Sequence, residues 1–294
     1  MPAHHHVRLR KSTFGSSVVE DMLRQFSALS RTWKVGSMTP IADKRVRCAA
    51  AFLAASVIVA ACLVATPAVA QGAPDYAAII AAPDRTDADR QTDNRRDPLK
   101  LLVFTGALAG MKVLDMGAGG GYSSELMARA VAPAGTVYAQ NPADLGERAK
   151  ARFNARLQTP AGKNIASVTR PFDDPLPAEV GELDLVTFLF FYHDTTYMNV
   201  DRAAMNRKLY AALKLGGFLI IADHSARPGD GTSVGKTFHR IEEASLRREV
   251  EAAGFKLVGE GDFWRHPEDT RDFSVQPPSG KPVDEFVLKF QKPM

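Results

Sequence analysis

Apolar positions downstream of residue 110 follow two alternating patterns, one typical of buried strands and one typical of amphipathic helices. The clearest strand signal is LDLVTFLFFY (183–192), an almost continuous apolar run, which indicates a strand covered on both faces. Similar short runs predict seven strands, at 111–117, 135–141, 165–170, 183–192, 218–223, 255–261 and 284–291.

Helical spacing fills most of the intervals between these strands. Helices are predicted at 122–132, 142–158, 201–213 and 238–253. Strands alternating with helices predict a doubly wound α/β fold with a mostly parallel seven-stranded sheet. The last two strands have no helix between them, so we expect them to pair antiparallel, with an antiparallel strand at one edge. Residues 111–294 are expected to form this single domain.

A polar, helical region precedes the first strand, and we interpret residues 72–110 as a helical cap. Arg85, Asp89 and Asp93 recur every four positions, with Arg96 three further on, so they share one helix face. Two interpretations stay open. The helix is either a solvated, salt-bridged one, or a cap that closes over a polar ligand.

Composition is ordinary for a globular protein, with 45% hydrophobic and 24% charged residues, which excludes a disordered, collagenous or multi-span membrane protein. The formal net charge is +4. Residues 1–70 hold nine basic and three acidic side chains, which leaves 28 basic and 30 acidic ones downstream. The downstream domain is therefore slightly acidic, with no basic run that would indicate a nucleic-acid partner.

The N-terminal charge belongs to a leader. Three basic residues precede the uncharged run 48–70, which ends in Ala-Val-Ala, the layout of a secretory signal with a small-residue cleavage site. We interpret 38–70 as a signal peptide or N-terminal membrane anchor, with a lipoprotein signal at Cys62 as a third alternative. Residues 1–37 are interpreted as a non-native or disordered extension, because Met38 begins a leader of usual shape.

This interpretation predicts an exported, periplasmic protein, or one anchored to the inner membrane by residues 48–70. Membrane contact is expected only through the leader, if it stays uncleaved or is lipidated. Both cysteines, Cys48 and Cys62, lie in the leader, so the domain has no thiol for a disulfide, a zinc–thiolate site or a nucleophile. We expect no metal site.

A glycine-rich loop, DMGAGGG (115–121), joins the first predicted strand to the helix that follows. Glycines let the backbone turn sharply and approach a ligand, and the N–H groups of the following helix face the same crevice. The dinucleotide fingerprint G-x-G-x-x-G needs a glycine at position 122, where Tyr122 stands. A nicotinamide-dependent oxidoreductase is therefore disfavoured.

VLDMGAGGGY (113–122) resembles motif I of the class I S-adenosylmethionine-dependent methyltransferases. DLVTFLFFYHD, LYAALKLGGFLIIAD and HRIEEASLRREVEAAGFKLV resemble later segments of that family, in the same order. The chain is most similar to a group of bacterial predicted methyltransferases that often carry secretion signals. The resemblance covers 76–294 and implies a Rossmann-like fold with S-adenosylmethionine as cofactor.

The resemblance also implies roles for four residues of the loop. Gly117, Gly119 and Gly121 would form the turn under the methionine part of the cofactor. Asp115 would help hold its amino group. The alternative for the aspartate is an ordinary turn or helix-capping role.

Two further positions match binding residues of the family. The family usually has a carboxylate for the ribose hydroxyls at the end of the second strand, and this chain departs from that pattern with the uncharged Asn141. After the third strand, Asp173, or its neighbour Asp174, matches the acid that binds the adenine amino group. Either side chain is alternatively a turn former.

The end of the fourth strand is where the family places its substrate-side chemistry. His193 and Asp194 are the catalytic candidates there, because a methyl acceptor with an O–H or N–H group must lose a proton and histidine has a near-neutral pKa. The alternative is a strand-end pair that caps the next helix. Asp223 and His224 carry the same two interpretations, while His239 is interpreted as structural.

These observations predict a methyltransferase that transfers a methyl group from S-adenosylmethionine to an unidentified small or lipophilic acceptor. The expected partner is thus a small-molecule substrate. The alternative is an exported, non-catalytic binding protein that retains the methyltransferase fold.

Overall fold

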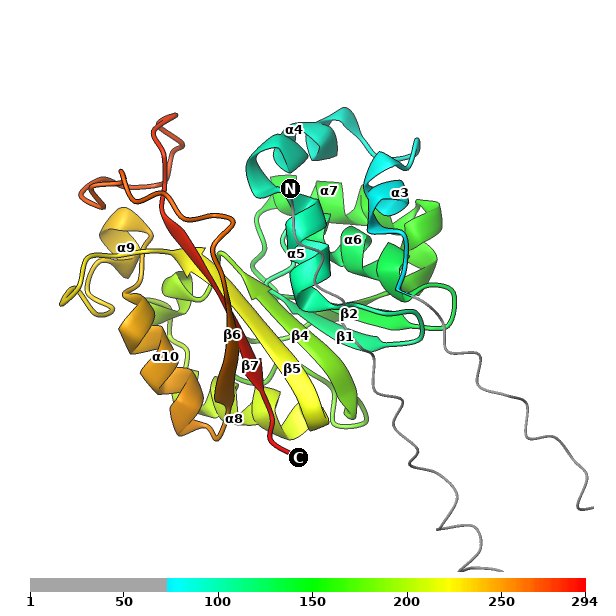
Figure 1. Cartoon of the computed structure of the whole chain (residues 1–294). Coiled ribbons are helices and arrows are strands. Elements are labelled where there is room, and N and C mark those ends of the chain that lie inside the picture. The colour runs from blue at the N-terminus through cyan, green and yellow to red at the C-terminus, as the bar shows by residue number, and fades with distance from the viewer. Residues whose placement is uncertain (1–72) are drawn as a thin grey trace, which may run out of the picture. The chain divides into compact units, whose positions relative to one another are not determined.

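The computed structural model describes residues 73–294 (Figure 1). The predicted extension at 1–37 and the leader at 38–70 lie outside the described residues. Within the described part of the chain, no helix is both long and apolar enough to cross a bilayer.

A seven-stranded sheet forms the centre of the domain, in the order β3-β2-β1-β4-β5-β7-β6 (Figure 1). Parallel pairing joins β3 to β2, β2 to β1, β1 to β4 and β4 to β5. The strands are β1 (Lys112–Met116), β2 (Thr136–Asn141), β3 (Ile165–Thr169), β4 (Leu183–Leu189), β5 (Leu213–His224), β6 (Lys256–Gly261) and β7 (Glu285–Gln291). The doubly wound, mostly parallel sheet expected from the sequence is therefore present.

The antiparallel part of the sheet differs from the expectation in one respect. β6 and β7 do pair antiparallel at one edge, but the edge strand is β6. β7 lies one position further in and pairs antiparallel with both β5 and β6. Since β7 is apolar on both faces, with Phe286, Val287 and Leu288 all buried, it stabilises the sheet more as an interior strand than at the rim.

Helices cover both faces of the sheet (Figure 1). They are α3 (Tyr76–Ala81), α4 (Asp87–Arg96), α5 (Pro98–Thr105), α6 (Tyr122–Val131), α7 (Glu147–Leu157), α8 (Arg202–Ala212), α9 (Gly235–Phe238) and α10 (Glu243–Ala252), with short 3-10 turns η1 (Pro160–Asn164) and η2 (His193–Thr196). The helix predicted at 142–158 begins five residues later. Of the helix predicted at 238–253, α10 forms only the later part, because α9 ends at Phe238 and α10 begins at Glu243.

Each face of the sheet has its own hydrophobic core. Neighbouring residues of β1 point to opposite faces, so Val113 joins a core with α5 and α6, whereas Leu114 joins a core with α8 and α10. The continuous apolar run of β4 follows from this arrangement, because both of its faces are covered. The two cores fix the carboxyl ends of β1, β2, β4 and β5 along one edge, where polar residues gather.

Candidate functional site

The glycine loop between β1 and α6 has the left-handed backbone that its sequence predicts. φ is +61° at Gly117, +56° at Gly119 and +79° at Gly121. Gly121 is also packed tightly, because an added Cβ would lie 2.9 Å from the Phe153 ring. At Gly119, by contrast, the nearest atom to an added Cβ is the Gly117 carbonyl oxygen, 3.9 Å away. The backbone at Gly119 is thus constrained while the space around it is open.

Two side chains at the end of β2 hold this loop in place. The backbone N–H of Gly117 donates to Gln140 Oε1 over 2.9 Å, and that of Gly119 donates to Asn141 Oδ1 over 2.7 Å. Asn141 Nδ2 donates weakly back to the Gly119 carbonyl over 3.3 Å. The structure therefore places Asn141 against the loop, with its oxygen already used. The matching role of Gln140 could not be predicted, because an amide near the end of a strand has no distinctive pattern.

Asp115 lies beneath the loop and is buried. Its carboxylate accepts hydrogen bonds from the hydroxyls of Ser123, Ser124 and Thr187 over 2.6–2.8 Å. Burial raises the pKa of Asp115, and the three donors oppose that shift only in part. The carboxylate thereby connects β1 and β4 to the first turn of α6.

A cavity of about 710 Å³ lies between the loop and the helix α4. The loop side contributes Gly117, Ala118, Gly120 and Ser123, and the α4 side contributes Arg96 and several polar residues. Neither Asp115 nor Asn141 is part of the lining. Residues of α4 line this cavity, and its role as a cap over a polar ligand stays a prediction.

The charged face of α4 is only partly solvated. Arg85, just before the helix, is buried and makes a bidentate ion pair with Asp93 at 2.6 and 2.8 Å. Tyr122 donates its hydroxyl hydrogen bond to the same Asp93 over 2.7 Å, which connects α4 to the start of α6. Asp89, also buried, is paired with Arg156 of α7.

Arg156 connects three parts of the site. Its guanidinium donates to Asp89 of α4 over 2.8 Å, to Glu125 of α6, and to the Gly120 carbonyl over 3.0 Å. Its side chain and both carboxylates are almost fully buried. Arg156 therefore holds the cap, the following helix and the loop together. A charged residue in an amphipathic helix is usually solvated, so the sequence did not single it out.

We expect Arg156→Met to open the cap without unfolding the domain. Loss of charge-assisted hydrogen bonds costs about 1.5–3 kcal/mol each, and Glu125 keeps Arg129 as a second partner. The amides of α4 should exchange with deuterium at least about tenfold faster, measured by mass spectrometry. Arg148→Met, at an exposed position of the same helix, is the control and should leave the exchange unchanged. Equal protection in both variants would show that other contacts hold α4.

Arg96, the last residue of α4, lines the cavity. Its guanidinium carbon lies 3.7 Å from the centre of the Phe190 ring, a cation–π contact. Among the described residues, its buried Nε atom has no hydrogen-bond partner. Burial and the neighbouring Arg95 lower the pKa of Arg96 to about 10, so it still carries its charge at neutral pH. An anionic group in the cavity would satisfy this side chain.

Asp173 does not join the cluster around the loop. It is half-buried after β3, and the aspartate next to it, Asp174, pairs with Arg170 and Lys208. The neighbouring Phe172 does approach the loop, where its ring stacks on Phe191 at 5.0 Å. The adenine-binding role of Asp173 stays a prediction, and Asp174 is already engaged in ion pairs.

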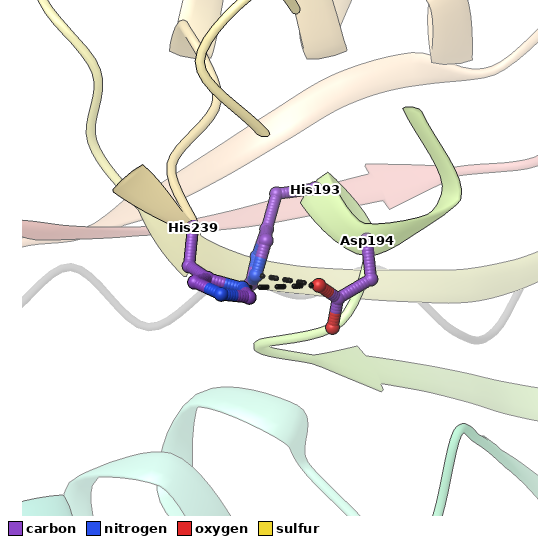
Figure 2. A group of neighbouring side chains, drawn as sticks. All are labelled: His193, Asp194 and His239. Carbon is purple, nitrogen blue, oxygen red and sulfur yellow. Dashed lines mark hydrogen bonds and ion pairs between the residues drawn. The ribbon is translucent and has the colours of Figure 1, made fainter. Parts of the chain in front are cut away.

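The catalytic candidates lie in a second polar cluster at the ends of β4 and β5. His193 is 3% exposed, and its Nδ1 lies 2.6 Å from Asp223 Oδ1. Its Nε2 lies 3.2 Å from Asp194 Oδ1. His239 Nδ1 approaches the same Asp194 oxygen at 3.3 Å (Figure 2). The sequence had suggested the pairs His193–Asp194 and Asp223–His224 separately, and the structure brings them together.

The charges around His193 decide whether its imidazole can act as the catalytic base. Burial lowers the pKa of His193, but Asp223 and Asp194 outweigh it and raise the pKa to about 10. An imidazole that is protonated at neutral pH cannot accept a proton from a substrate. The base role of His193 therefore stays a prediction, and it requires a state in which this proton is absent.

His239 takes a different place from the one that the sequence suggested. Instead of lying within a long helix, it ends α9 in the left-handed conformation, with φ of +52°. Its ring packs edge-on to His193, with ring centres 5.5 Å apart. A helix that breaks where there is no glycine or proline gives no local signal in the sequence. The contact between His239 and His193 was therefore not predicted.

Comparisons with known proteins identify the fold. No protein-family model and no curated protein match the sequence. Solved structures do match. An S-adenosylmethionine-dependent methyltransferase from Aquifex aeolicus is 18% identical, with a TM-score of 0.50 over 71% of this chain and 100% of its own. The 4+2 cyclase SpnF is 15% identical, with a TM-score of 0.51 over 70% of this chain and 81% of its own.

At these identities the likeness concerns the fold and not the reaction, as the different names of the two proteins illustrate. The chain has the fold of S-adenosylmethionine-dependent methyltransferases.

Proposed function

We propose that this protein is an S-adenosylmethionine-dependent methyltransferase that acts on a small or lipophilic acceptor. The observation that carries the proposal is the cavity between the left-handed glycine loop and α4. Both walls of this cavity are built by buried, specific contacts, which a simple tight turn would not need.

The residues of the cavity fit this cofactor. A volume of about 710 Å³ is within the range of small-molecule sites. Gly117 and Gly120 allow a ligand to approach the backbone closely. Arg96, with its unpartnered Nε, would donate to the carboxylate of the methionine part. Tyr122 and Ser123, at the N-terminus of α6, line the same space, and helix N-termini favour anionic groups.

Asp115 and Asn141 act indirectly in this proposal. Both side chains bond to the loop or to the first turn of α6, and neither lines the cavity. They would position the loop against the cofactor, where the family resemblance suggested direct contacts. Ser123, which lines the cavity and donates to Asp115, is then the residue that transmits this positioning.

When bound, the cofactor supplies a methyl group activated by a positive sulfonium. The protein must align the acceptor with that methyl group and exclude water. Phe190 separates the cavity from the polar cluster, since it lines the cavity and its ring centre lies 5.1 Å from that of His224.

The leader adds a proposal about location. We infer from its sequence that the domain is exported, and an exported methyltransferase needs a supply of cofactor outside the cytoplasm. The non-catalytic alternative would remove this need, but no contact of the described residues favours it over an enzyme.

Calorimetry of the full chain with S-adenosylhomocysteine tests the proposal. We expect one binding site per chain. Arg96→Met should weaken the affinity about tenfold or more, because a lost charge-assisted hydrogen bond costs about 1.5–3 kcal/mol. Arg207→Met, at an exposed position of α8, is the matched control and should bind as the parent does. No heat of binding at millimolar ligand would overturn the methyltransferase proposal.

A further inference from the structure

Three side chains with metal-binding atoms converge beside the polar end of β4. They are His193, Asp194 and His239, and their ligand atoms all lie within 4.8 Å of one another. Figure 2 shows both imidazoles directed at the same carboxylate. The proposed methyl transfer does not use this convergence, and it does not explain why His239 should be there.

The spacing of these atoms matches that of ligands around one ion. Nitrogen and oxygen ligands at about 2.0–2.2 Å from a metal lie about 2.9–3.5 Å from each other, whether the geometry is tetrahedral or octahedral. The two distances to Asp194 Oδ1, 3.2 Å from His193 Nε2 and 3.3 Å from His239 Nδ1, fall in this range. Small side-chain movements, with release of the proton that His193 otherwise carries, would therefore place an ion between the three groups.

A second carboxylate orients the buried histidine from behind. Asp223 Oδ1 lies 2.6 Å from His193 Nδ1, and Asp223 Oδ2 accepts the backbone N–H of His193 over 2.8 Å. Asp223 also accepts the backbone N–H of His224. This arrangement directs Nε2 of His193 toward Asp194. A carboxylate behind a metal-binding histidine is the usual outer partner in such sites, where it fixes the ring and increases its basicity.

The chain also fixes the third ligand. Arg240, directly after His239, is fully buried and makes an ion pair of 2.8 Å with Asp269. The same guanidinium donates to the Ser225 carbonyl over 2.9 Å. His239 is thereby held against η2 while its side chain stays 26% exposed. The cluster is buried on the His193 side and accessible on the His239 side.

We propose that His193 Nε2, the Asp194 carboxylate and His239 Nδ1 bind a divalent transition-metal ion. Two imidazoles and one carboxylate suit Zn²⁺, Co²⁺, Mn²⁺ or Fe²⁺ better than Mg²⁺ or Ca²⁺. Three protein ligands leave at least one position open, as in catalytic sites, and the accessible side of the cluster is where water or an acceptor would enter. The proposal replaces the expectation of no metal site and does not depend on the proposed cofactor.

Zinc calorimetry and the visible spectrum of added Co²⁺ test the site on the full chain. Other metal-binding side chains must be removed first, so the parent carries alanine at His4, His5 and His6, and serine at Cys48 and Cys62. We expect this parent to bind one Zn²⁺ per chain. Bound Co²⁺ should show d–d absorption bands that differ from those of the ion in buffer.

Two variants remove single ligands without a change of backbone. Glycine accepts the left-handed conformation at position 239, so His239→Gly removes the imidazole without strain. Asp194→Asn keeps the shape of the side chain and removes its charge. We expect each to weaken Zn²⁺ binding more than tenfold and to abolish the cobalt bands, with circular dichroism unchanged.

His266→Ala is the matched control, because His266 is an exposed histidine that also lies beside a carboxylate, at 3.1 Å from Glu268. It should bind metal as the parent does. The proposal is wrong if the parent binds no Zn²⁺ at micromolar concentration, or if His239→Gly and Asp194→Asn both retain the parent's affinity. The first result would show that the cluster is only a network of hydrogen bonds.

Discussion

Asp269→Asn is expected to lower the free energy of unfolding by about 3–5 kcal/mol, the largest effect of any single substitution considered for this domain. Arg240 and Asp269 are both fully buried in their side chains and lie 2.8 Å apart. The neutral amide keeps the shape of the carboxylate, but it leaves the guanidinium charged and without a counter-ion. Desolvation of that charge is then no longer compensated.

Urea unfolding followed by circular dichroism measures this effect. Asp272→Asn, in the same loop, is the control because its ion pair with Arg227 is half-exposed, and we expect it to leave the urea midpoint nearly unchanged. Adding Arg240→Met to Asp269→Asn should recover part of the loss, since no unpaired charge then remains. A cost below about 1 kcal/mol for Asp269→Asn would contradict the burial of the pair.

Gly119→Val is expected to weaken S-adenosylhomocysteine binding at least about 100-fold, equivalent to about 2.7 kcal/mol. At φ of +56° a β-branched residue is strained, so the backbone of the loop must move. Ala118 and Gly120, the neighbours on either side, line the cavity and would be displaced with it. Because no atom lies nearer than 3.9 Å to an added Cβ, the domain should stay folded, with a loss of about 1–2 kcal/mol.

Calorimetry measures the affinity, and a thermal melt checks the fold. Gly146→Val is the control, because Gly146 has φ of −58° and an added Cβ there has no atom within 4 Å. It should bind the ligand as the parent does. Unchanged affinity in Gly119→Val would show that the loop makes a tight turn without holding a cofactor.

The fold could be predicted from the sequence because its signals are local. A strand covered on both faces needs a continuous apolar run, and the run in β4 was visible for that reason. The glycines of the loop were equally visible, since left-handed backbone at three positions within five residues leaves few other choices. The strand β7 was also predicted, but its place in the sheet was not. Its pairing with β5 depends on contacts between residues more than sixty positions apart in the sequence.

The site was predicted less completely, because much of it depends on contacts between distant residues. Arg156 contacts Asp89 from 67 positions away, and His239 approaches Asp194 from 45 positions away. The periodicity of apolar residues along the chain does not predict contacts between such distant positions. The resemblance suggested direct ligand contacts for Asp115 and Asn141, whereas the structure shows Asn141 bonded to the loop and Asp115 bonded to the first turn of α6.

The interior position of β7 determines when the sheet can be completed. β5 has β7 as its outer neighbour, and β6 reaches the sheet only through β7. Until β7 has been synthesised, the growing chain therefore has an unpaired β5 edge and a detached β6, both open to pairing with other chains. Completion of this sheet therefore requires β7, the strand that covers the β5 edge and carries β6.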